Sequence, residues 1–178
     1  MADFGANYPC FCPDGASKTG VVLGKLVSAN LTVNLASGEL YADDGLAEQL
    51  SEFASGSIAM ETDDLSDANA EAVYGCTVSD GVVTFNKEDT APRGKLCYYK
   101  VLMRQGVKYF KAYFYPRVRA AVGNDNAQTK GSSITFQTTS TMFTVFADDD
   151  GVWRKIKTCD TAADAKTWIN TQCNITGG

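Results

Sequence analysis

The 178-residue sequence contains no histidine. This absence excludes Ser-His and Cys-His nucleophile pairs, imidazole general bases and most transition-metal sites. It also has no run of about eighteen apolar residues and no basic N-terminal segment followed by an apolar one, so neither a membrane span nor a signal peptide is indicated. We therefore expect a protein without a membrane anchor that folds in a cytoplasm, and we predict no cofactor, metal ion or catalytic residue.

The six cysteines lack the spacing of a metal site. They stand at positions 10, 12, 76, 97, 159 and 173, without a CxxC pair and without a histidine that could complete a zinc site. Free thiols are the expected state in the absence of an export signal. Cys76 and Cys97 have apolar surroundings and are predicted to be small core residues.

Charge and carboxylate spacing limit the possible functions further. A net charge of −5 argues against affinity for phosphate backbones, which requires clustered Lys and Arg. Asp-Gly pairs end both acidic clusters, 43–45 and 148–151, and such pairs form turns. Neither cluster has the spacing of an EF-hand loop, so we interpret both as turns. Acid catalysis by paired carboxylates remains a remote alternative.

The β-favouring stretch from Ser132 to Ala147 is the most informative segment present, because a strand of that length exceeds the usual five or six residues. Its alternation changes phase between Ile134 and Phe143. Residues Thr138, Thr139, Ser140 and Thr141 are therefore predicted to form a bend or bulge, followed by a segment buried on both faces.

Several other elements follow from periodicity and turn residues. Strands are predicted over 21–35 and 56–62, joined by a connection over 36–55 whose part from Leu46 to Phe53 is either a loop or a short helix. Next along the chain we predict a short strand over 82–85. It is followed by a hairpin of 95–104 with 107–119, which turns at Gln105-Gly106. Pro116 belongs at a strand edge or a bulge.

Two short helices are predicted from their caps. Ser66 would begin the first and Gly75 would end it, while Asp160-Thr161 would cap a C-terminal helix over 162–172. The fold class is therefore all-β with one or two small α-helices, a β-sandwich or small barrel. One domain over 20–157 is expected, with a C-terminal helix and tail over 158–178.

Residues 1–19 are predicted to form an irregular N-terminal arm. Its aromatic residues Phe4, Tyr8 and Phe11 need packing partners, either on their own domain or on a neighbouring subunit.

The second strand of the central hairpin presents two faces. Phe110, Ala112, Phe114 and Val118 alternate with a face made of Tyr109, Lys111, Tyr113, Tyr115, Arg117 and Arg119. The mixed aromatic and basic face has the composition of a nucleic-acid-binding surface, but in an acidic chain we favour a solvated or subunit-facing surface. A carbohydrate-binding platform of its three tyrosines is an alternative.

Four short motifs, in order along the chain, resemble one protein family. LYADDG at 40–45 and TKGSSITFQT at 129–138 are similar to the LYADDG and TKGDSIEFQT of the major tail protein of long-tailed bacteriophages of the phi13 type. The pair Ala91-Pro92 before the hairpin and DDGVW at 149–153 also match. The first twenty residues and the segment after Trp153 depart from the family pattern.

The resemblance implies a structural protein without catalysis. Such a subunit is a β-sandwich with a flanking helix that assembles with itself into stacked hexameric rings, forming a tail tube in the virion after synthesis in the host cytoplasm. DNA passes through without specific binding, and we expect a net acidic bore. Tape-measure, tail-terminator and tip proteins are the implied partners. The inner tube of a contractile injection system or bacteriocin is an alternative with the same fold.

The resemblance also implies roles for particular residues. Leu40, Tyr41, Ala42, Asp43, Asp44 and Gly45 would lie in an inter-subunit loop that reaches an adjacent ring. The segment from Thr138 to Thr141 would mark the point where a strand leaves its own core and joins the tube wall.

Overall fold

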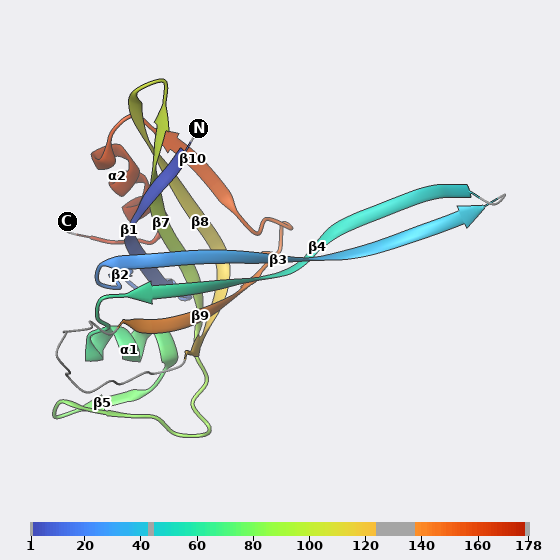
Figure 1. Cartoon of the computed structure of the whole chain (residues 1–178). Coiled ribbons are helices and arrows are strands. Elements are labelled where there is room, and N and C mark those ends of the chain that lie inside the picture. Colours follow the sequence, from blue (N-terminus) through green and yellow to red (C-terminus); the bar gives the residue numbers. More distant parts are fainter. Residues whose placement is uncertain (1, 43–44, 124–137, 177–178) are drawn as a thin grey trace, which may run out of the picture.

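The structure is a computed structural model that describes residues 2–42, 45–123 and 138–176 (Figure 1). Its described part is mostly β-strand with two short helices, which confirms the predicted fold class. The elements in chain order are β1 (Ala2–Pro13), β2 (Val21–Val22), β3 (Leu26–Ala42), β4 (Gly45–Thr62), α1 (Asp67–Tyr74), β5 (Thr77–Ser79), β6 (Val82–Thr84), β7 (Arg93–Arg104), β8 (Val107–Val122), β9 (Thr139–Phe146), β10 (Lys155–Cys159) and α2 (Ala162–Gln172).

The principal sheet is antiparallel throughout, in the order β2-β1-β7-β8-β9-β4-β3. Strand β8 is shared: residues 110–114 pair with β10, and residues 117–122 pair with β9. The short strands β5 and β6 form a separate two-stranded hairpin, in agreement with the strand expected near Val82.

The sheet curls so that strands distant in its order face each other. The rings of Phe11 on β1 and Phe143 on β9 lie 5.9 Å apart between centroids, although β7 and β8 separate their strands. Side chains from both layers therefore share one hydrophobic core. This arrangement gives the sheet its sandwich-like form.

Two hydrophobic clusters lie on opposite faces of β1, β7 and β8. The first, which we call the inner core, is covered by α1 and includes Phe11, Ile58, Met60, Val73, Tyr74, Leu96, Tyr98, Tyr113, Tyr115, Val118, Phe143 and Val145. The second, which we call the helix-side core, is covered by α2 and consists of Cys10, Cys12, Cys97, Tyr99, Ala112, Phe114, Cys159, Ala165, Ile169 and Cys173. Strands β1, β7 and β8 thus carry buried side chains on both faces.

Both helices form where their caps predict them. The Ser66 hydroxyl accepts a hydrogen bond from the Asn69 backbone N–H, and Gly75 ends α1 in the left-handed region at φ 70°. At α2 the Thr161 hydroxyl accepts from the Asp164 N–H. These local interactions supply partners for backbone groups that the first helical turn leaves unpaired.

The central hairpin of β7 and β8 is confirmed, with Gln105 at φ 50° and Gly106 at φ 80° in its turn. A register shift lies opposite Pro116, which confirms the predicted bulge. The bulge changes which face the following side chains occupy. Val118 therefore lies in the inner core with Tyr115, and its predicted grouping with Phe114 is wrong.

The predicted exposure of the tyrosine face of β8 is also wrong. Tyr113 is 7% exposed and Tyr115 is fully buried, because the curled sheet covers that face as well. Neither ring lies on a solvated or subunit-facing surface. Tyr109 is half-buried, so the three tyrosines do not form an exposed platform for carbohydrate.

The N-terminal arm is a strand rather than an irregular segment. Strand β1 pairs with β7 along most of its length and with β2 near Cys10. Register shifts between Phe4 and Ala6 and between Asn7 and Cys10, together with a positive φ at Gly5 and Tyr8, interrupt the alternation. Those interruptions and the two prolines account for the missing periodicity in the sequence.

The connection predicted over 36–55 is instead the outer part of the long hairpin formed by β3 and β4. Residues Leu46 to Phe53 are a strand, so both the loop and the helix interpretations are wrong. Apolar residues at 46, 50 and 53 have the spacing of a helix face, but pairing with β3 imposes extended backbone.

The long strand predicted over 132–147 is described only in its second half. Residues 132–137 lie outside the described part, and β9 runs from Thr139 to Phe146. Its pairing with β4 is regular from Thr139 onward, without the expected bulge. Phe143 and Val145 are buried while Met142 and Phe146 are exposed, so the strand is not buried on both faces.

Candidate self-association surface

A two-stranded hairpin projects from the body of the protein (Figure 1). Strand β4 pairs with β9 only from Gly56 onward, and a register shift between Asn34 and Leu35 lies next to that point. Residues 34–42 and 45–55 therefore lie beyond the last residue pair that β4 forms with β9. We call them the projecting hairpin. At about 3.3 Å per residue, they extend roughly 30 Å.

The projecting hairpin exposes large apolar side chains. Leu35 is 60% exposed and Leu50 is 62% exposed, while Val33 at its base is 37% exposed. No Lys or Arg occurs anywhere between Lys25 and Lys87, so the hairpin lacks the lysines that commonly protect an exposed strand from pairing with other chains. Exposed apolar residues on an unprotected strand favour association with another surface.

Strand β3 also has a free edge. In the described sheet it pairs with β4 on one side and ends the strand order on the other. The inner part of β3 lies close to β1, whereas its outer part presents a row of backbone N–H and C=O groups to a further strand. The hairpin therefore offers both apolar side chains and backbone hydrogen-bonding groups.

Aromatic stacking supports the base of the projecting hairpin. The Phe53 ring on β4 stacks on Trp153, with centroids 4.4 Å apart and planes inclined by 3°. The Arg154 guanidinium lies 4.6 Å from the centroid of the Trp153 ring. The stack joins the hairpin to the segment between β9 and β10 and so restricts the direction in which the hairpin leaves the body.

The predicted inter-subunit loop falls at the end of this hairpin. Leu40, Tyr41 and Ala42 end β3 and pair with Glu48, Leu46 and Gly45 at the start of β4. Asp43 and Asp44 lie outside the described residues. The structure therefore places Leu40, Tyr41, Ala42 and Gly45 at the far end of a hairpin rather than in a loop between separate strands. The role of the predicted residues in subunit contacts stays a prediction.

The three aromatic residues of the N-terminal segment have different surroundings. Phe11 is fully buried in the inner core and has no surface to offer a second subunit. The Tyr8 hydroxyl donates to Asn170 Oδ1 on α2 at 2.9 Å. Phe4 is 47% exposed and is the most available of the three for contact with another chain.

The predicted inter-subunit strand residues lie at the start of β9. Thr138 is exposed and precedes the strand, whereas Thr139 and Ser140 are half-buried. Thr141 is buried, and its hydroxyl lies 2.5 Å from the Tyr74 hydroxyl on α1. Thr141 therefore joins β9 to its own helix, and contact of these four residues with another subunit remains a prediction.

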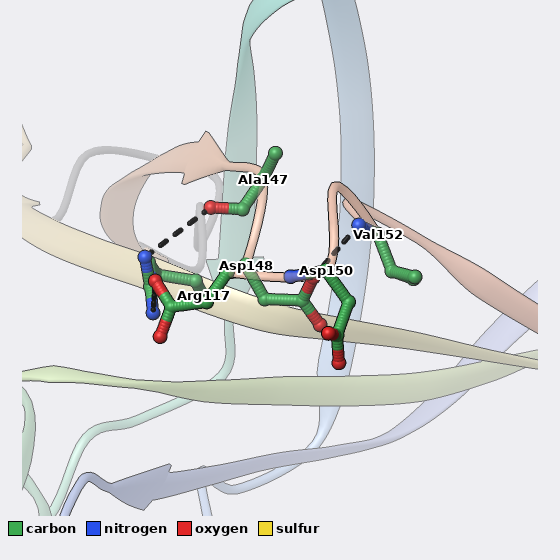
Figure 2. Close-up of polar contacts among 6 residues, drawn as sticks. Arg117, Ala147, Asp148, Asp150 and Val152 are labelled. Atoms are coloured by element: carbon green, nitrogen blue, oxygen red, sulfur yellow. Dashed lines mark hydrogen bonds and ion pairs between the residues drawn. The ribbon is translucent and has the colours of Figure 1, made fainter.

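The acidic cluster after β9 forms a turn, as Figure 2 shows. Asp148 Oδ1 accepts hydrogen bonds from the backbone N–H groups of Asp150 at 3.1 Å and Val152 at 2.7 Å. Arg117 Nη2 forms an ion pair of 2.9 Å with Asp149 Oδ1. These carboxylates thus have structural partners, and among the described residues no cluster of three or more Cys, Asp or Glu is arranged to hold a metal ion.

Sequence reasoning missed Leu35 and Leu50 as candidate contact residues. The alternation of Leu31, Val33 and Leu35 was a signal that extended strand continues outward, and the lack of proline over 36–55 allowed it to continue. The sequence does not show that β3 and β4 extend beyond the end of β9. Leu35 and Leu50 on the extended part have no third strand beside them and are exposed.

No protein-family model matches the chain, and no match was found among curated proteins. Among the described helices, neither is long and apolar enough to cross a membrane.

Proposed function

We propose that the protein is the structural subunit of a phage-type tail tube, which assembles with copies of itself into stacked hexameric rings around a channel for DNA. The observation that carries the proposal is the projecting hairpin, whose exposed Leu35 and Leu50 and free β3 edge have the character of an interface. The ordered motifs of the sequence and the absence of histidine support it.

In the proposed assembly, each projecting hairpin lies against another subunit. Burial of two leucines that are about 60% exposed in the single chain contributes roughly 1–2 kcal/mol for each side chain. In a closed ring this contribution is repeated at every subunit contact. The hairpin carries carboxylates without Lys or Arg, so it binds best to a neutral or basic surface of the neighbour.

Electron microscopy and sedimentation velocity over a concentration series test the proposal. The wild-type protein is expected to form rings or tubes as its concentration rises, whereas Leu35→Ser combined with Leu50→Ser remains monomeric. A wild-type protein that stays monomeric at every concentration, even with tail-assembly partners present, contradicts the proposed function.

Val82→Ser provides the matched control. Val82 is 61% exposed, like the two leucines, but it lies on the β5–β6 hairpin at a different part of the body. We expect this variant to assemble as the wild type does. Equal loss of assembly in the control and in the double variant would show that the projecting hairpin has no special role.

A further inference from the structure

Five of the six cysteines lie in one cluster, the helix-side core. Cys10 on β1 is directly opposite Cys97 on β7 in the strand register. Cys173 ends α2 and packs against the same strands, while Cys12 and Cys159 lie further along the cluster. All five side chains are buried.

Two of these thiols are in direct contact. Cys173 Sγ lies 2.8 Å from Cys97 Sγ, and both residues are fully buried. The gap is roughly 0.8 Å longer than a covalent S–S bond of about 2.05 Å. The Cys10 thiol has a different partner, since it donates to the Tyr8 carbonyl at 3.6 Å.

The position of Cys173 is fixed from several sides. Its backbone N–H donates to the Ile169 carbonyl at 2.9 Å, as the last turn of α2 closes. The neighbouring Asn174 carbonyl accepts from the Gly20 N–H at 3.3 Å. A Cβ at Gly20 would approach the Cys173 carbonyl oxygen to 2.2 Å, so only glycine permits this packing of the chain beneath Cys173.

We propose that Cys97 and Cys173 are a redox modification site, which closes to a disulfide when the protein meets an oxidised low-molecular-weight disulfide such as oxidised glutathione. Two exchange steps complete the reaction. One thiolate attacks the small disulfide and releases one small thiol, and the second protein thiolate then attacks the mixed disulfide and releases the other. The Sγ–Sγ bond forms as the small disulfide is reduced to two thiols.

Burial controls the rate of this step. Desolvation raises the pKa of the Cys97 thiol well above its usual range, and the contact with Cys173 acts in the same direction. Because the thiolate is the attacking species, the reaction requires the C-terminal end of α2 to open. We therefore expect slow oxidation at neutral pH and faster oxidation at higher pH or temperature.

The bond would join two distant parts of the chain. Cys97 and Cys173 are 76 residues apart in sequence, and a link across so long a loop restricts the unfolded chain strongly. For a protein of this size the expected rise in melting temperature is on the order of 10 °C. The site needs no second copy of the protein, so it is independent of the proposed assembly.

Peptide mapping tests the proposal. The reduced full-length protein is incubated with oxidised glutathione at pH 8.5 and 37 °C, conditions chosen to admit local opening, then alkylated in denaturant and digested with trypsin. We expect peptide 96–100 to be linked to peptide 167–178, with the other four cysteines alkylated. Six alkylated cysteines, stable glutathione adducts alone or a different linked pair would each overturn the proposal.

Thermal unfolding of variants gives a second readout. Oxidation should raise the melting temperature of the wild type and of Cys159→Ala, a control from the same cluster, but not that of Cys173→Ala. A Cys173→Ala variant that gains as much as the wild type would overturn the proposal. Should that variant fail to fold, the peptide map of the wild type decides the question by itself.

Discussion

The hydroxyl groups of Tyr98 on β7 and Tyr115 on β8 lie 3.2 Å apart in the inner core. Both residues are almost completely buried, and their rings stack with centroids 6.0 Å apart. Arg154 also interacts favourably with the Tyr115 hydroxyl and lowers its pKa, against the larger effect of burial, which raises it. Because a buried hydroxyl without a partner is costly, the two tyrosines are expected to respond differently to mutation.

We predict that Tyr115→Phe destabilises the protein by about 1–3 kcal/mol, because the Tyr98 hydroxyl then loses its partner. Tyr98→Phe should cost less, since Tyr115 keeps Arg154. The double variant should cost less than the sum of the single variants. Urea unfolding of the four proteins measures these energies, and strictly additive values would contradict the hydrogen bond.

Stability is predicted to fall in alkaline solution. Burial raises the pKa of Tyr74, Tyr98 and Tyr115, and of the Cys10 and Cys97 thiols. Below the unfolded-state pKa values, about 8.5 for Cys and 10 for Tyr, the folded and the unfolded protein both hold these protons. The free energy of unfolding is then at its full value. As the pH rises past those values the unfolded state releases protons first, so the free energy of unfolding decreases.

Urea unfolding at pH 8, 9, 10 and 11 checks this dependence. The doubly substituted Tyr98→Phe, Tyr115→Phe protein serves as the control, because it lacks two of the five groups and should lose less stability between pH 10 and 11. A free energy of unfolding that stays constant up to pH 11 would refute the prediction.

The stack of Phe53 on Trp153 is predicted to hold the base of the projecting hairpin. Phe53→Ala should destabilise the protein by about 1–3 kcal/mol through lost burial and ring contact. It should also speed hydrogen exchange of backbone amides in residues 46–55. Phe146→Ala, at an aromatic residue 38% exposed on β9, is the control and should leave exchange in the hairpin unchanged.

The neighbouring carboxylates Asp148 and Asp149 should differ in their effect on stability. Asp148→Ala removes the acceptor for two backbone N–H groups and should cost about 1–2 kcal/mol, whereas Asp148→Asn retains an Oδ1 acceptor and should cost less. Asp149→Ala removes an ion pair whose carboxylate side is 90% exposed, with an effect of about 0.5 kcal/mol or less. Thermal unfolding of the three variants tests this order.

Elements whose signals are local were predicted closely from the sequence. The caps at Ser66 and Thr161 and the turn at Gln105-Gly106 act within a few residues, and they placed both helices and the central hairpin. The bulge at Pro116 followed from the missing N–H of proline. Each of these signals depends on backbone geometry at its own position.

Elements that depend on distant partners were not predicted. Strand β1 becomes a strand by pairing with β7, more than eighty residues later in the chain. Tyr113 and Tyr115 are buried because β4 and β9 curl across that face, which alternation within β8 does not reveal. The outer hairpin was mistaken for a connection because nothing within 36–55 shows where the neighbouring strand β9 ends.

The shared strand β8 has a consequence for the order of folding. In the described sheet, the β3–β4 hairpin joins the other strands only through β9, and β9 and β10 both pair with β8. A chain emerging from the ribosome has made the β3–β4 hairpin long before β9, the strand that pairs with the base of that hairpin. Ile58 and Met60, which are buried in the part of β4 that pairs with β9, therefore remain without that partner until the last quarter of the chain is synthesised, so premature pairing between nascent copies competes with folding.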